Sequence, residues 1–234
     1  MSEEDSIPRY ENIPNVTKDT CWYDSSDVPE QMLLGAKGVL WPVLEKSDHF
    51  PVLDSLISET KEDAFTLLDL GCGAADLSRL YPNFYYTGAD LSNIIKEVAM
   101  KMHPQNSYVS FDIYDDKAEF IKDYDVVVMN AFIDVLQKPL IGLSKVLTHG
   151  SKYVILHRQA FSDKRETHLY RYPSYGGVDS YQSVINRKQF SELLEEKEFE
   201  IVKELPLHYG PPPGYETSAF TKENYTRSIL MRRK

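Results

Sequence analysis

The chain has 234 residues and is 42% hydrophobic, which suffices for one domain whose core needs no disulfide bonds. Its formal net charge of −10 argues against a long nucleic acid as partner, because binding phosphates requires clustered Lys and Arg. The cysteines, Cys21 and Cys72, lack the spacing of a zinc site and suit a reducing compartment. We expect a cytoplasmic protein without a metal site.

Residues 1–60 are predicted to form a polar tail followed by a helical cap. The N-terminus lacks the basic and apolar regions of a signal peptide, and no apolar run approaches the ~20 residues that cross a bilayer. Between Val28 and about Leu56, apolar residues recur at helical spacing, which predicts one or two helices. Residues 61–234 are predicted to form the main domain.

Strand-like and helix-like segments alternate through the main domain. The predicted strands are 65–70, 84–89, 108–113, 124–130, 152–157, 200–205 and 227–232. The predicted helices are 75–80, 92–102, 117–122, 133–147 and 187–197. Near-continuous apolar strands separated by helices are typical of a parallel sheet covered on both faces, so we expect a doubly wound α/β fold.

The stretch from Thr66 to Asp76 contains an apolar strand, an acidic residue and a glycine loop. A dinucleotide-binding loop has glycine at its sixth position, so that the backbone can approach a pyrophosphate. This loop has Asp76 at that position. The Asp76 carboxylate would repel that group, which disfavours a nicotinamide dinucleotide. S-adenosylmethionine has no phosphate, and its ammonium and sulfonium suit acidic neighbours such as Asp69.

Acidic residues stand at the ends of three successive predicted strands. Asp69 closes the first strand, Asp90 follows the second, and Asp112 falls within the end of the third. The carboxyl ends of parallel strands meet at one edge of a sheet, where ligands bind. Asp90 is then placed to accept two hydrogen bonds from a ribose diol, and Asp112 to accept one from an adenine amine. The alternative is that these aspartates only cap the helices that follow.

Two segments, Leu67–Ala74 and Thr87–Ser92, together resemble the class I S-adenosylmethionine-dependent methyltransferases. The resemblance covers about Phe65 to Phe161 and implies a seven-stranded Rossmann-like sheet with an antiparallel last strand. Ala75 departs from the family, which usually has a third glycine at that position. The implied cofactor is S-adenosyl-L-methionine.

The resemblance also implies which residues bind this cofactor. The Gly71–Gly73 backbone would lie beside the methionine moiety, Asp90 on the ribose, and Asp112 with Ile113 beside the adenine. The end of the fourth strand would face the transferring methyl group. The implied cofactor-binding residues are Asp69, Gly71, Cys72, Gly73, Asp90, Leu91, Asp112, Ile113, Asn130 and Ala131. Cys72 is interpreted as a small space-filler and not as a nucleophile.

Candidate acceptor-side residues lie near the end of the fifth predicted strand. His157 is the favoured general base there, although a packing or capping role is an alternative. Phe132, which follows the fourth predicted strand, and Arg158 are candidate substrate-binding residues. An insertion at about 160–186 is rich in tyrosine and predicts a substrate cover, with a structural hairpin as the alternative. Its candidate residues are Tyr172, Tyr175 and Tyr181.

The predicted function is methyl transfer to an oxygen or nitrogen of a small molecule. A weaker similarity of the cap, the insertion and Val128–Leu136 points to sugars of surface glycans as one acceptor class. Two alternatives stay open, a cofactor-binding regulatory subunit without activity and a nicotinamide-dependent oxidoreductase. No nucleic acid or membrane partner is expected, and the sequence does not specify an oligomeric state.

Overall fold

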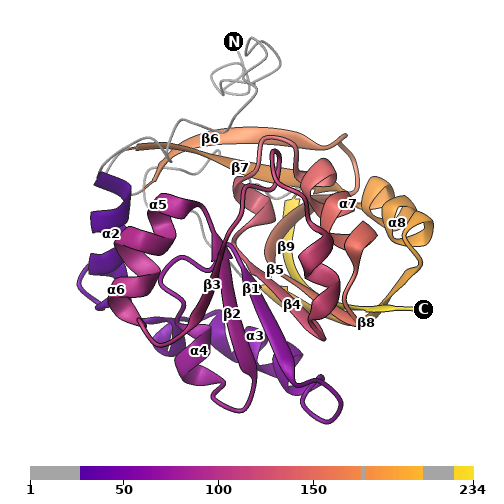
Figure 1. Ribbon diagram of the computed structural model, residues 1–234. Helices are drawn as coiled ribbons and strands as arrows, with labels where there is room; N and C mark the ends of the chain where they lie inside the picture. The colour runs from indigo at the N-terminus through magenta and orange to yellow at the C-terminus, as the bar shows by residue number, and fades with distance from the viewer. Residues whose placement is uncertain (1–26, 175–177, 208–223) are drawn as a thin grey trace, which may run out of the picture.

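A nine-stranded sheet forms the centre of the structure, a computed structural model that describes residues 27–174, 178–207 and 224–234 (Figure 1). The strands run in the order β3-β2-β1-β4-β5-β7-β6, and β9 pairs with both β5 and β8. Their bounds are Thr66–Leu70 (β1), Tyr85–Asp90 (β2), Ser107–Ser110 (β3), Val126–Asn130 (β4), Tyr153–Ser162 (β5), His168–Ser174 (β6), Val178–Asn186 (β7), Phe199–Leu207 (β8) and Asn224–Arg233 (β9). Strands β1 to β5 are parallel, and β9 is antiparallel to β5 and β8.

The sheet contains the predicted doubly wound core, but the predicted count of seven strands is too low. Seven strands coincide with the predicted ones, and the last of them, β9, is antiparallel as the resemblance implied. Strands β6 and β7 form a hairpin within the predicted insertion, along the top of Figure 1. Strand β4 pairs only with Tyr153–His157 of β5. The same edge of β5 is therefore open at Ala160–Ser162, and β7 pairs with it there.

Helices cover both faces of the sheet. Alternate residues of a strand point to opposite faces, so a strand with apolar residues at successive positions needs cover on both. On β1, Leu67 packs in one core with Leu56 of α3, whereas Leu68 packs in the other with Leu143 of α7. The α-helices are Asp27–Ala36 (α2), Phe50–Ser58 (α3), Leu77–Leu80 (α4), Ser92–Ile94 (α5), Met100–Met102 (α6), Pro139–His149 (α7) and Arg187–Glu196 (α8). The 3-10 helices are Leu44–Lys46 (η3), Glu119–Asp123 (η5) and Ile133–Val135 (η6), and Ile95–Ala99 (η4) is a π-helical turn.

The helical predictions differ from the structure at three places, one of which is 117–122, where the chain forms only the 3-10 turn η5. The expected helix 133–147 is divided into η6 and α7, because Pro139 begins α7 and the residue before a proline disfavours helical backbone. The expected helix 92–102 is continuous but contains a π-helical turn, η4. The predicted cap is α2, η3 and α3, and no helix of the described segments has the length and apolarity needed to cross a bilayer.

A β-bulge interrupts the pairing of β5 with β9. Leu156 pairs with Ile229 and Gln159 with Arg227, so that two residues of β5, His157 and Arg158, lie opposite Ser228 alone. Arg158 has a φ of 70°, a left-handed backbone conformation that is uncommon for residues other than glycine. The extra residue changes the direction in which the side chains at the end of β5 project.

The packing of Leu68, a residue of β1, against α7 provides a test of the fold. Leu68 is fully buried, so Leu68→Ala should lower the free energy of unfolding by ~2–5 kcal/mol through lost burial and a residual cavity. Phe65, just before β1, is 64% exposed, and Phe65→Ala should change it by only about 0.5 kcal/mol. Urea denaturation followed by circular dichroism measures both, and equal losses would contradict the assigned core.

Candidate functional site

A cavity of about 240 Å³ lies at the carboxyl ends of the parallel strands, between the glycine loop and the cap. Most of the residues predicted from the sequence line it, namely Asp69, Gly71, Cys72, Gly73, Asp90, Leu91, Asn130, Ala131, Phe132 and Arg158. The cap supplies a further wall that was not predicted, formed by Met32, Gly35, Ala36, Trp41, Pro42, Val43, Leu44, Ser47 and His49. The cavity is therefore built jointly by the sheet edge and the N-terminal helices.

The glycine loop has a backbone that side chains would disturb. Gly71 has a φ of 78°, and a Cβ there would lie 2.5 Å from the ring of Phe132. Gly73 has a φ of 49°, and a Cβ there would lie 2.9 Å from the end of Met32. Ala75, which replaces the expected third glycine, also has a positive φ of 62°. The loop thus keeps the glycine conformation at Ala75 and accepts the strain of a Cβ.

The Asp90 carboxylate holds the glycine loop against the end of β2. One of its oxygens accepts a hydrogen bond from the Gly73 amide at 2.9 Å, and the other accepts one from its own neighbour, the Leu91 amide, at 2.8 Å. Burial raises the pKa of Asp90 to about 6, and these two amide donors oppose that rise. Each carboxylate oxygen has a second lone pair, so the group can still accept hydrogen bonds from a ligand.

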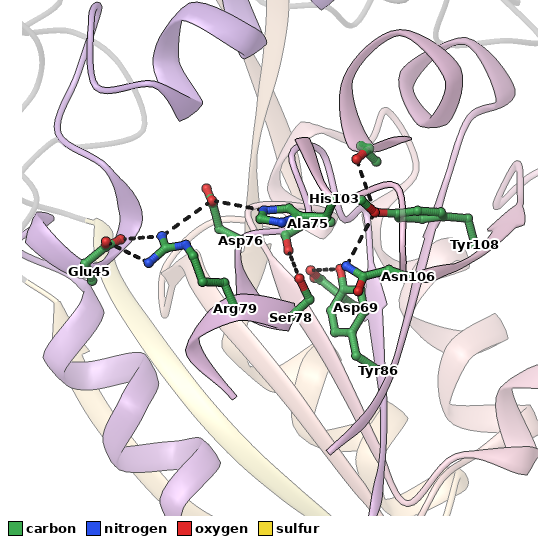
Figure 2. Close-up of polar contacts among 11 residues, drawn as sticks. Glu45, Asp69, Ala75, Asp76, Ser78, Arg79, Tyr86, His103, Asn106 and Tyr108 are labelled. Carbon is green, nitrogen blue, oxygen red and sulfur yellow. Dashed lines mark hydrogen bonds and ion pairs between the residues drawn. The ribbon is translucent and has the colours of Figure 1, made fainter. Parts of the chain in front are cut away.

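Two further carboxyl groups border the same loop (Figure 2). Asp69 accepts a hydrogen bond from the Tyr86 hydroxyl at 2.8 Å, and burial raises the pKa of Asp69 to about 7. Asp76 lies 3.7 Å from Arg79, and burial raises its pKa as well. Arg79 in turn binds Glu45 of η3 through both of its terminal nitrogens. This end of the cavity is acidic and unsuited to a phosphate.

Cys72 behaves as a space-filler. It is buried with Ala75 and Ala99, and burial raises the pKa of its thiol well above the usual range. A Cβ on Gly88 of β2 would lie 2.9 Å from the Cys72 sulfur, so the strand needs glycine where the loop packs on it. The thiol is therefore neutral and enclosed, unlike a catalytic nucleophile.

The structure does not bring Asp112 and Ile113 to the described wall of the cavity. Strand β3 ends at Ser110, earlier than predicted, and the Asp112 carboxylate accepts a hydrogen bond from the Tyr114 amide at 2.9 Å. Ile113 is buried in the core beside α7. Asp112 therefore stabilises its own loop through the backbone, whereas Asp69 and Asp90 border the cavity.

The segment after β4 forms the next part of the wall. The side-chain oxygen of Asn130 is buried and has no hydrogen-bond partner among the described residues. Ala131 has a φ of 54°, and Phe132 packs its ring against Gly71. The unpartnered Asn130 oxygen is available to a ligand that carries a hydrogen-bond donor.

His49 of the cap lines the cavity, and His157 lies behind His49, away from the cavity. His157 is 1% exposed and is absent from the described lining, whereas His49 lines the cavity. The His157 Nε2 lies 3.0 Å from the His49 Nδ1, and its Nδ1 lies 2.6 Å from the Ser228 Oγ. The geometry therefore does not support direct proton transfer from a cavity ligand to His157, because its neighbours occupy both ring nitrogens.

The protonation state of this histidine pair follows from Arg158. The Arg158 guanidinium lies 3.2 Å from the His49 Nε2, and because a guanidinium only donates, that nitrogen must accept. A neutral His49 then donates from Nδ1 to His157, which donates from its own Nδ1 to Ser228. Burial, reinforced by the Arg158 charge, lowers the pKa of His49 to about 3, and burial also holds the pKa of His157 well below its usual range.

The tyrosine-rich insertion contributes no described residue to the wall. Tyr181 of β7 is 4% exposed and does not line the cavity, and Tyr172 belongs to β6 with its backbone opposite Ser180. Tyr175 lies outside the described residues. The described part of the insertion is a hairpin, and its role as a substrate cover stays a prediction.

Sequence reasoning missed the cap side of the cavity, above all His49 and Trp41. The helical periodicity of 28–56 predicted the cap itself, but no local pattern showed that the cap would meet the end of β5. A signal was present at Gly35, where the Trp41 indole occupies the position of any Cβ, at 1.8 Å. A glycine within a helix that is followed by a tryptophan is too common a pattern to identify such a contact.

Comparison with known proteins supports the fold. No protein-family model matches the chain. A malonyl-[acyl-carrier protein] O-methyltransferase from Halalkalibacterium halodurans is 34% identical over an alignment of 97 residues that covers 38% of this chain. The match covers only 36% of that relative's length.

Solved structures extend the comparison over most of the chain. The magnesium protoporphyrin IX methyltransferase ChlM of Synechocystis PCC 6803 with bound SAM has a TM-score of 0.53 at 16% identity, covering 79% of this chain and 77% of that one. A SAM-dependent methyltransferase from Methanosarcina mazei gives 0.55 at 16% identity, over 76% and 96%. The [4+2]-cyclase SpnF gives 0.56 at 17% identity, over 88% and 93%. The chain has the Rossmann-like fold of the class I methyltransferases, as its motifs predicted.

The raised pKa of Asp69 generates a prediction about stability and pH. Because the pKa is about 7 when folded, the native state binds a proton that the unfolded chain releases above about pH 4, so stability falls as pH rises to 7. Asp69→Asn retains an acceptor for Tyr86 but does not titrate. Its free energy of unfolding relative to wild type should increase by ~1–4 kcal/mol between pH 4 and pH 8.

Asp63 provides the matched control for this experiment. It is exposed, and its hydrogen bond with Lys152 lowers its pKa. Asp63→Asn should therefore become less stable relative to wild type as the pH rises, the opposite trend. Urea denaturation at several pH values measures both variants, and a pH-independent effect of Asp69→Asn would contradict the assigned burial.

The histidine arrangement predicts a spectroscopic signature. Long-range ¹H–¹⁵N correlation spectra should show His49 and His157 neutral from pH 8 to pH 5, both protonated at Nδ1, because Arg158 requires an acceptor at His49 Nε2. Spectra of His49→Gln and His157→Gln assign the signals. Protonation of His49 at Nε2 would show that the guanidinium does not bind it.

Proposed function

We propose that the protein binds S-adenosylmethionine and transfers its methyl group to an oxygen or nitrogen of a small molecule. The observation that carries this proposal is the Asp90 carboxylate, which is bound to Gly73 and borders the cavity beside the glycine loop. A buried carboxylate at the end of the second strand suits a ribose diol, which donates two hydrogen bonds to it.

The remaining cofactor residues fit the other parts of that ligand. The Asn130 oxygen, buried without a partner among the described residues, can accept a hydrogen bond from the cofactor's ammonium group. Asp69 and Asp76 make this end of the cavity acidic, which favours a cation and disfavours the diphosphate of a nicotinamide dinucleotide. The buried, acidic site therefore supports a cofactor without phosphate.

In the proposed mechanism the protein mainly aligns the methyl donor with the acceptor, and its side chains supply little chemistry of their own. When bound, the cofactor supplies an electrophilic methyl group on a sulfonium. The loop backbone at Gly71 and Gly73 and the Asp90 carboxylate hold the cofactor, while Phe132, packed on Gly71, closes the wall after β4. Cap residues such as Trp41 reduce the access of water. Fixing donor and acceptor in line is the main source of rate for such a displacement.

The acceptor is proposed from several weaker observations. The net charge of −10 supports a small molecule in preference to a nucleic acid, and the cysteine usage supports a cytoplasmic location. Named relatives act on a porphyrin and on a malonyl-acyl carrier. The N-terminal domain of EvdMO1, with a TM-score of 0.54 at 19% identity over 80% of this chain and 85% of that one, was solved in the presence of SAH and D-fucose. A sugar therefore stays among the proposed acceptors.

Cofactor binding tests the proposal directly. Isothermal calorimetry with S-adenosylhomocysteine should show saturable binding to wild type, and Asp90→Asn should weaken it about 10- to 100-fold, because the amide cannot accept from both ribose hydroxyls and Gly73. Asp112→Asn is the matched control. Asp112 caps its own loop away from the described cavity wall, so the affinity should stay within about twofold.

The outcomes separate the alternatives. Binding of NADH without S-adenosylhomocysteine would favour an oxidoreductase and overturn the proposal. Cofactor binding without turnover on a broad acceptor panel would favour a regulatory subunit. An unchanged affinity in Asp90→Asn would show that the cofactor does not bind this carboxylate, and equal losses in both variants would show that Asp112 binds the cofactor as well.

A further inference from the structure

Arg158 brings a guanidinium to the cavity wall beside the end of β4. It follows His157, which pairs with Asn130, and it lines the same cavity as Asn130 and Phe132. The bulge on β5 separates the two side chains, because His157 packs inward on Ser228 while Arg158 reaches the cavity. A positively charged group thus stands near the place proposed for the methyl group.

Neighbouring groups hold Arg158 in place, and the two histidines among them are neutral near pH 7. His49 Nε2 accepts from the guanidinium, and both His49 and His157 stay neutral because burial lowers their pKa values and the nearby Arg158 charge lowers them further. Asp134 of η6 is 8% exposed and interacts electrostatically with Arg158. Its pKa is raised by burial to about 6, so this carboxyl is largely ionised at pH 7 and offsets part of the guanidinium charge.

These groups leave no evident base for the acceptor at this end of the cavity. Both nitrogens of His49 are engaged, and its lone pair at Nε2 faces Arg158. His157 and Asp134 are buried and are not among the described lining residues. An alcohol or an ammonium must lose a proton before or during methyl transfer, and no described residue at this end of the wall is placed to take it. The carboxyl groups of Asp69, Asp76 and Asp90 lie around the glycine loop, at the end proposed for the cofactor.

A carboxylate requires no such base. With an ordinary pKa near ~4 it is already ionised at neutral pH, and a guanidinium binds it with two parallel hydrogen bonds. Building on the methyl transfer proposed above, we infer that Arg158 binds a carboxylate of the acceptor and that the methylated atom is an oxygen of that carboxylate. The product is a methyl ester.

The reaction balances without a proton. A lone pair of the carboxylate oxygen forms the new bond to the methyl carbon, and the carbon–sulfur bond breaks with its electron pair going to sulfur. The negative charge of the carboxylate and the positive charge of the sulfonium both disappear. The products are the ester and S-adenosylhomocysteine, so neither an oxidant nor a base takes part.

The cap indicates what the carboxylate is attached to. Trp41, Pro42 and Val43 line the cavity with largely apolar surface, and Trp41 is 42% exposed beside it. An indole face and short aliphatic side chains suit an apolar body that carries the acid group at one end. A monocarboxylate with a hydrocarbon chain is therefore a suitable binding probe.

The test compares hexanoate with hexanamide, which differ in charge but little in size. Calorimetry on protein saturated with S-adenosylhomocysteine should show hexanoate binding at least about tenfold more tightly than hexanamide. Arg158→Gln should abolish this difference, and Arg158→Lys should retain part of it, because lysine keeps the charge without the fork. Arg232→Gln is the matched control, since Arg232 is an exposed residue paired with Glu200 on β8.

The readouts distinguish failure of this inference from failure of the proposed function. If S-adenosylhomocysteine does not bind wild type, methyl transfer is wrong, and hexanoate titration of the unloaded protein still tests Arg158. If the cofactor binds but hexanoate does not, or if the acid and the amide bind equally, the inference is overturned. A preference for the acid that survives Arg158→Gln also overturns it. Should Arg158→Gln not fold, the wild-type comparison and Arg158→Lys decide.

Turnover provides the second readout. With S-adenosylmethionine tritiated on the methyl group and a panel of carboxylic acids with their matched alcohols and amines, label should enter products that release methanol in mild base. Base-stable methylation would contradict a carboxylate acceptor.

Discussion

The hydrogen bond from the Gly73 amide to the Asp90 carboxylate is the contact on which the geometry of the site depends. It joins the loop after β1 to the end of β2, and the amides of Gly71 and Cys72 strengthen the same junction by donating to the Ala89 carbonyl. Burial of the Asp90 carboxyl is unfavourable, and the two amide donors compensate for part of that cost. The carboxylate proposed to bind the cofactor thus also has a structural role, because it joins the glycine loop to β2.

Packing transmits this arrangement to the neighbouring strands. Phe132 can lie on Gly71 only because that position has no side chain, and this contact sets the segment after β4 against the glycine loop. Cys72 likewise fits against Gly88 of β2. The floor of the cavity is therefore determined by close approaches between backbone and side chains, in which glycine provides the space.

The two chemically distinct regions of the cavity come from different parts of the fold. Strand ends and the glycine loop supply the acidic region around Asp69, Asp76 and Asp90. The bulge of β5 and the cap supply the other, in which Arg158 is held by a neutral histidine pair. An acidic region suits a cationic cofactor and a guanidinium suits an anionic acceptor, so the two reactants would enter with complementary charges.

The sequence by itself determined the features that depend on neighbours along the chain. Strand and helix periodicity predicted the doubly wound core, and the residues of the glycine loop with Asp90 predicted the cofactor side of the cavity, because hydrogen bonds there follow from one β-α-β unit. Asp112 does not line the described cavity, because β3 ends at Ser110, three residues before the predicted end, and the Asp112 carboxylate accepts a hydrogen bond from the Tyr114 amide. Only the tertiary structure decided that His157 is enclosed, that His49 replaces it at the cavity, and that a bulge presents Arg158. Those outcomes depend on contacts between the cap, β5 and β9, residues that are distant in sequence, and no local pattern encodes the packing that brings them together.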